Sequence, residues 1–182
     1  AVPMLLALAC HRSPEMRSGI LPTLGRAAGK DQIVLAVLKQ ATHDRVFRVR
    51  MNAVAGLWNA TEDLSMLVPH WLLLQEPAPQ DADEQEKTFR ALAGVFVAQQ
   101  FHDLGKTRPA ETATVLLSLL ADDSPVIRRG AARMLGAMTT SSKDAKRILK
   151  EKKVLEAVKK LLDDPDELVR FSAAVAVERL SK

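Results

Sequence analysis

The sequence is poor in aromatic residues and in cysteine. Aromatic residues make up 4% of its 182 residues, and tyrosine is absent. The core must therefore be built from leucine, valine, alanine and methionine, which pack between helices when they recur at spacings of three and four. The single cysteine, Cys10, excludes an internal disulfide and a multi-cysteine metal site. This usage is typical of a reducing, intracellular compartment, either cytoplasmic or nuclear.

Long apolar runs are missing as well. Residues 4–10 are too few to cross a bilayer, and no basic leader with a cleavage site precedes them. With 47% hydrophobic residues and a mean hydropathy near zero, the composition is that of a folded soluble protein. We expect one domain over residues 1–182 and no membrane partner. The chain begins with alanine and an apolar segment, so we expect a fragment of a larger protein, or self-association through apolar ends.

Enzyme motifs are absent from the sequence. It contains no HExxH, GxGxxG, GxxxxGK[ST] or GxSxG element. Its four histidines, spread about thirty residues apart, do not share a helical face as metal ligands would. They are His11, His43, His70 and His102. We therefore predict no catalytic residue, no metal and no cofactor, and a metal-dependent enzyme is the least favoured alternative.

What the sequence does contain is a recurring pair, an acidic residue six positions before an arginine. The four arginines are separated by 40, 38 and 42 residues, and Arg17, with His11 in the acidic position, precedes the first of them by 33. A recurrence of this length indicates stacked helical hairpins. The pairs are Asp44 with Arg50, Glu84 with Arg90, Asp122 with Arg128, and Asp164 with Arg170.

Apolar stripes at helical spacing divide the chain into five hairpins. Residues 13–25 match residues 124–136 at six of thirteen positions, which supports the repeat. Asp164 is predicted to cap the last helix with Pro165 in its first turn, as Ser124 and Ser13 do before their own prolines. The first helices are expected at about 2–10, 31–41, 62–74, 110–121 and 153–162, and the second helices at about 14–27, 44–60, 83–102, 125–138 and 166–181.

On these motifs the chain resembles the HEAT-repeat family and its armadillo relatives over nearly its full length. The resemblance implies an all-α, right-handed superhelix of about five hairpins, with the second helices on the concave side. It also implies a ladder in which each turn acid accepts from free N–H groups while the arginine reaches an adjoining carboxylate or carbonyl. The first unit departs from the pattern through His11 and through Pro22 inside its second helix. Residues 18–22 look like an armadillo helix junction, and residues 143–151 like the extra first helix of an armadillo unit.

Repeat stacks present long rigid surfaces, and their usual role is protein recognition. We therefore expect a non-enzymatic protein-interaction or scaffolding module with a protein or peptide partner. The armadillo mode of peptide binding needs a ladder of asparagines, and only Asn59 stands at the aligned position. The alternative for the two tryptophans, Trp58 and Trp71, is packing between helices. The candidates for partner contact are the second-helix residues Asn52, Trp58, Asn59, Arg129 and Arg133.

The net charge of +4 is unevenly placed. Residues 76–86 carry five acids and no base, and Pro77 and Pro79 predict an exposed acidic loop over about 75–87. Residues 143–160 carry eight lysines or arginines against three acids, a local net charge of +5. This segment is either a solvated helix face or a contact for acidic protein, with nucleic-acid binding as the alternative function. We define its basic strip as Lys143, Lys146, Arg147, Lys150, Lys153, Lys159 and Lys160.

Overall fold

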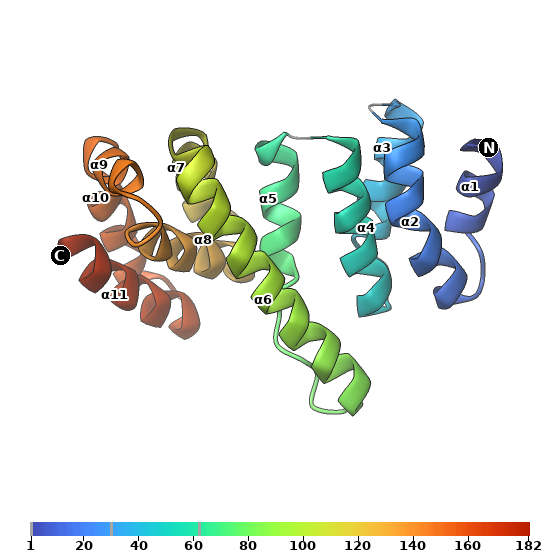
Figure 1. Ribbon diagram of the computed structural model, residues 1–182. Helices are drawn as coiled ribbons and strands as arrows, with labels where there is room; N and C mark the ends of the chain where they lie inside the picture. Colours follow the sequence, from blue (N-terminus) through green and yellow to red (C-terminus); the bar gives the residue numbers. More distant parts are fainter. Residues whose placement is uncertain (1, 30, 62) are drawn as a thin grey trace. The chain divides into compact units, whose positions relative to one another are not determined.

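The computed structural model describes residues 2–29, 31–61 and 63–182, and all regular secondary structure within these ranges is helical (Figure 1). The predicted all-α class is therefore confirmed. The chain divides into two compact units, residues 1–93 and residues 94–182. The expectation of one domain stays a prediction.

Apart from α9, the helices alternate between first and second members of hairpins, as the sequence predicts. The predicted start at Glu62 lies outside the described residues. A separate helix at α9 confirms the armadillo-like element, whereas α2 runs without interruption through residues 18–22, so the alternative junction there is wrong. The elements are α1 (Val2–Ala9), α2 (Pro14–Ala28), α3 (Gln32–Ala41), α4 (Phe47–Ala60), α5 (Leu64–Leu73), α6 (Glu84–Thr107), α7 (Pro109–Ser118), η1 (Leu119–Ala121), α8 (Pro125–Met138), α9 (Lys143–Glu151), α10 (Val154–Lys159), η2 (Lys160–Asp163) and α11 (Glu167–Ser181).

The helix starts follow the predicted chemistry in part. Ser13 caps α2 by accepting from the N–H of Met16, whereas Ser124 stands before Pro125 at the start of α8 but its side chain makes no capping hydrogen bond. Helix α11 begins later than predicted, and its cap is Asp166, which accepts from the N–H of Val169. Because the turn extends past Pro165, Asp164 does not cap α11, and its carboxylate accepts from Arg128 instead.

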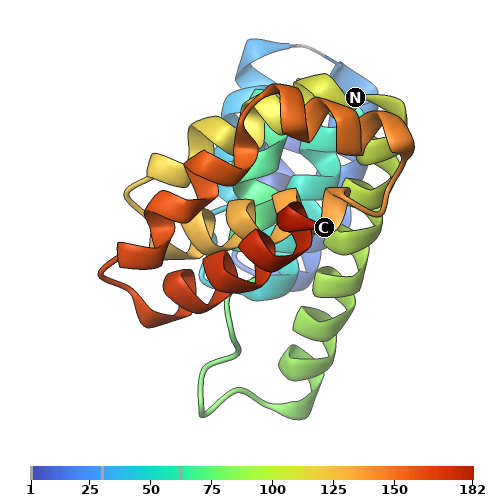
Figure 2. The same ribbon diagram turned by 90° about the vertical axis from the view of Figure 1, so that its left-hand side faces the viewer.

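Second helices of successive repeats lie side by side within each unit. Helix α2 packs against α4 in the first unit, and α8 packs against α11 in the second (Figures 1 and 2). Gly25 and Gly56 permit the first contact, since a Cβ on Gly56 would lie 2.6 Å from the carbonyl oxygen of Leu21. Trp71 and Leu57 are among the fully buried side chains of this unit, and Met138 and Leu116 of the other.

Arg128 joins neighbouring turns in the second unit. Its Nε and Nη2 donate to the carboxylate of Asp164 at 2.8 and 2.9 Å, and its Nη1 donates to the carbonyl oxygen of Asp122 at 2.8 Å. The carboxylate of Asp164 also accepts from the N–H of Asp166, and its carbonyl accepts from Arg170. Arg128 and Arg170 therefore each hold the main chain of their own turn, and the carboxylate of Asp164 pairs with the arginine of the preceding repeat.

The first unit repeats this arrangement. Arg17 donates to the carboxylate of Asp44 at 2.8 and 3.1 Å, and to the carbonyl oxygen of His11 at 2.9 Å. Arg50 donates to the carbonyl oxygen of Asp44 at 2.9 Å. A histidine thus replaces the acid in the first turn without loss of the main-chain contact, because that contact uses only the carbonyl group.

The third pair differs from the prediction. Arg90 does not contact Glu84, which accepts from Lys87 instead; it pairs with Glu86 and donates to the carbonyl oxygens of Glu76 and the following proline. These carbonyls lie 14 and 13 positions before the arginine, whereas the other repeats use positions 6 and 5. Compared with the other repeats, eight extra residues therefore separate Glu76 from Arg90. Most of this insertion lies in the extended loop before α6 in Figures 1 and 2.

The carboxylate that belongs to this turn is that of Glu76. It lies 4.0 Å from Nη2 of Arg50, a longer contact than the 2.8 Å pair that Asp44 makes with Arg17, the arginine of its own preceding repeat. The sequence pattern selected Glu84 because the insertion happens to place another acid six positions before Arg90.

Candidate functional site

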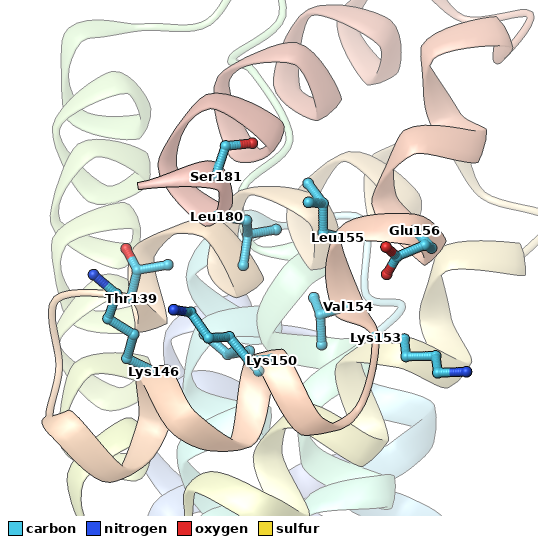
Figure 3. A pocket seen from close by; sticks show the side chains of 10 residues that line it. Thr139, Lys146, Lys150, Lys153, Val154, Leu155, Glu156, Leu180 and Ser181 are labelled. Atoms are coloured by element: carbon cyan, nitrogen blue, oxygen red, sulfur yellow. The ribbon is translucent and has the colours of Figure 1, made fainter.

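A pocket of about 310 Å³ opens among α9, α10 and the end of α11 in the second unit (Figure 3). Its apolar wall consists of Leu149 and Val154, both buried, and of Leu155 and Leu180, both half-buried. Three lysines from the basic strip, Lys146, Lys150 and Lys153, stand at its rim, together with Glu156. We call this hollow the lysine pocket.

Lys146 and Lys150 reach the same pocket because of their spacing along α9. Positions 146, 149 and 150 lie on one helical face, so these two cations flank the leucine that faces the hollow, whereas Lys153 follows the end of α9. Figure 3 shows Lys150 pointing over the hollow, with Lys153 at the end where Glu156 lies. The predicted side of the strip that joins Lys146, Lys150 and Lys153 is therefore a pocket rim rather than a flat surface.

The acids of α9 are directed to the other face of the helix. Arg147 pairs with Glu151 at 2.7 Å and with Asp144 at 3.6 Å, and the hydrogen bond to Glu151 is the main cause that raises the pKa of Arg147. Lys146 donates to the main-chain oxygen of Lys182 at 3.2 Å. Within the described part of the chain Lys150 has no ion-pair partner. The pocket rim therefore keeps its positive charge.

Lys153 joins α9 to α10 in an unusual backbone conformation. Its φ of 52° and ψ of 38° are left-handed, and among the described residues it is the only non-glycine with a positive φ. A side chain in this region costs about 1–2 kcal/mol per residue. The sharp corner allows α10 to close the pocket against α9.

The rest of the basic strip lies outside the pocket. Lys143, Lys159 and Lys160 are exposed but do not line it. The apolar wall was not part of the predicted site. The sequence feature that corresponds to this wall is the recurrence of leucine and valine between the lysines. The same pattern is found in any helix that packs in a core, so it did not indicate a pocket.

A second feature is a groove between α8 and α11. Arg133 from α8 lines it with Phe171, Val175 and Arg179 from α11, and its volume is about 70 Å³. The 42-residue offset between Arg128 and Arg170 makes Phe171 and Val175 the counterparts of Arg129 and Arg133. Phe171 is 68% exposed, Arg133 is exposed and Arg129 is half-buried. We call this feature the second-helix groove.

The other predicted partner contacts are engaged inside the first unit. Asn52 donates to the hydroxyl of the buried Ser18 at 2.6 Å. Trp58 is half-buried, with its ring centroid 5.3 Å from that of the fully buried Trp71. Asn59 is exposed and donates to the carbonyl oxygen of Pro22 at 3.1 Å. These contacts place Asn52 and Trp58 between helices.

His11 and His43 lie in turns, whereas His70 and His102 lie within α5 and α6. The rings of His43 and His70 meet edge to face at 5.9 Å, and burial, followed by the nearby His43, lowers the pKa of His70. His102 lies 3.5 Å from the hydroxyl of Ser141. In the described residues no three side chains of histidine, cysteine, aspartate or glutamate gather as a metal site would require. The same part of the chain contains no helix with the length and apolar character needed to cross a membrane.

Comparison with known proteins identifies repeats in the second half of the chain. Residues 100–178 match the family model of HEAT repeats. No curated protein sequence was found to match the chain. Among solved structures it is similar to a designed armadillo repeat protein in complex with the peptide (KR)4, at 21% identity, covering 99% of this chain and 82% of that one, with a TM-score of 0.45. A second designed armadillo repeat protein is 19% identical, with coverages of 99% and 100% and a TM-score of 0.36. An engineered protein is 16% identical, with coverages of 99% and 96% and a TM-score of 0.40.

Proposed function

We propose that this chain, of which residues 100–178 match the family model of HEAT repeats, is a non-enzymatic, intracellular module that binds a partner protein on its helical surface. The observation that carries the proposal is the second-helix groove. There an aromatic side chain that is 68% exposed, Phe171, lies beside Arg133 and Arg179.

The composition of the groove is that of a recognition site. Aromatic residues and arginine are enriched where protein interfaces are most tightly packed, and they carry most of the binding free energy. Covering an exposed phenylalanine with a partner removes apolar surface from water, which contributes favourably to the free energy of binding. The flanking guanidinium groups offer planar hydrogen-bond donors to carboxylates and carbonyls of the partner. Because α8 and α11 pack against each other, these side chains are presented on rigid elements.

Crosslinking with variants tests the proposal. We expect Phe171→Ser and Arg133→Glu each to weaken capture of the protein partner by about tenfold or more, since both sit at the centre of the contact. Ile33→Ser is the matched control, because Ile33 is 66% exposed on α3 and lies in the other unit. Crosslinked peptides should map to α8 and α11. Equal capture by all three variants would remove the groove from the binding site.

A further inference from the structure

We propose that the lysine pocket binds an acidic peptide segment of a partner protein. The peptide carboxylates lie on Lys146, Lys150 and Lys153, and one aliphatic side chain enters the hollow against Leu155 and Leu180. This inference rests on the proposed function only in requiring a protein partner. The site is distinct from the second-helix groove, with which it shares no lining residue.

The positive charge of the pocket rim favours an anionic ligand. Arg147 engages both Asp144 and Glu151, so the acids of α9 do not neutralise the rim. Glu156 is the one carboxylate in the lining, against three lysines. Long lysine side chains also cover apolar surface with their methylene groups while the ammonium stays in water. The rim is therefore suited to carboxylates that approach from solvent.

The size and the apolar wall of the pocket favour an aliphatic side chain of the ligand. Its volume of about 310 Å³ is at the lower end of the range for ligand sites, and its wall is formed by leucine and valine side chains. An aliphatic group that enters would gain about 25 cal/mol for each Å² of apolar surface removed from water. An acidic segment that contains a leucine or valine uses both the rim and the wall.

Nucleic acid fits the pocket less well. A phosphate backbone binds rows of cations and has no apolar side chain for the hollow. Single-stranded nucleic acid also stacks its bases on aromatic residues, and residues 139–160 contain none. Glu156 in the lining would repel a phosphate. The structure therefore favours a peptide over a nucleic acid as the occupant.

Fluorescence anisotropy with a defined probe tests this inference. The probe is a fluorescein-labelled peptide with glutamates on both sides of one leucine, and the full chain is titrated in about 50 and about 200 mM salt. We expect Lys146→Gln combined with Lys150→Gln to weaken binding about fivefold or more. Lys159→Gln combined with Lys160→Gln is the matched control, since it removes the same charge from the same strip outside the pocket.

Altered probe peptides identify which chemical groups the pocket recognises. Replacing the leucine of the probe with serine, or its glutamates with glutamines, should each weaken binding. Equal losses in the two lysine double variants, no binding at low salt, or tighter binding of DNA oligonucleotides with the same dependence on Lys150 would each overturn the proposal. Circular dichroism melting of every variant shows that the fold is retained. Because the probe is a defined peptide, its failure leaves the crosslinking test of the second-helix groove unaffected.

Discussion

At the residue scale, the bidentate contact between Arg128 and Asp164 carries the connection between two turns. Their side chains are 12% and 5% exposed. The hydrogen bonds are charge-assisted, and Arg128 also satisfies two carbonyl groups of its own turn. Removing either partner leaves a buried charge without compensation, which costs more than the pair itself contributes.

The dependence of the free energy of unfolding on pH tests the contact between Arg128 and Asp164. The hydrogen bond from Arg128, opposed by burial, holds the pKa of Asp164 below its ordinary value of 3.8. The unfolded chain therefore binds a proton at a higher pH than the folded chain does. The stabilisation that this contact gives to the folded chain is complete at pH values above the pKa of Asp164 in the unfolded chain. It is lost as the pH falls through the pKa of Asp164 in the folded chain. We expect Asp164→Asn to lower the free energy of unfolding at pH 7 by about 1–3 kcal/mol and to flatten its dependence on pH below about 4.

Denaturant titrations at a series of pH values measure both effects. Asp123→Asn is the control, because Asp123 is an exposed acid in a neighbouring turn. Its free energy of unfolding should stay within about 0.5 kcal/mol of the wild type. An unchanged pH profile for Asp164→Asn would contradict the assigned contact.

At the element scale, glycines set how closely second helices approach. Gly25 faces the main chain of Gly56 where α2 crosses α4, and Gly136 faces Ala176 where α8 crosses α11. Gly25 and Gly136 are matched positions of the sequence repeat, 111 residues apart. The same small residue therefore serves the same contact in both units.

Two alanine substitutions in one helix separate packing from helix propensity. Gly25→Ala is expected to destabilise the protein by about 1–3 kcal/mol, because its Cβ would overlap the carbonyl group of Gly56. Gly19→Ala is expected to stabilise it by about 0.5–1 kcal/mol, because no atom lies within 4 Å of the added methyl group. Denaturant titration measures both. A stabilising Gly25→Ala would show that α2 and α4 are less closely packed than described.

At the scale of the whole molecule, the chain tolerates an insertion inside a repeat. The eight extra residues between Glu76 and Arg90 leave the contacts of Arg90 to the main chain in place. Loops of this kind change stability little, because the entropy of closing a loop grows only slowly with its length. The insertion therefore adds an exposed acidic surface without altering the repeat.

Deleting residues 77–84 tests this view. The deletion brings Arg90 to six positions after Glu76, the spacing found in the other repeats, and we expect the free energy of unfolding to stay within about 1 kcal/mol of the wild type. Deleting residues 77–86 shortens the spacing to four and removes the Glu86 partner, so this control should be strongly destabilised. Thermal melting followed by circular dichroism compares the two. Similar melting of both deletions would show that the spacing is unimportant.

The sequence by itself determined the class of the molecule, the helix positions and most of the turns. Hydrophobic spacing and capping residues act over a few neighbouring positions, and the repeat shows them several times over. For this reason the predicted hairpins agree with the helices, and the resemblance to HEAT repeats is confirmed by the match over residues 100–178.

Only the tertiary structure decided which residues meet across turns and surfaces. Spacing along the chain selected Glu84, but the folded loop brings Glu76 to Arg50. Spacing also grouped Lys146 with Lys150, yet the apolar wall behind them includes Leu180, which is thirty residues further along the chain. Contacts between distant segments depend on how helices pack and where loops return, and these distances are not encoded in any local period of the sequence.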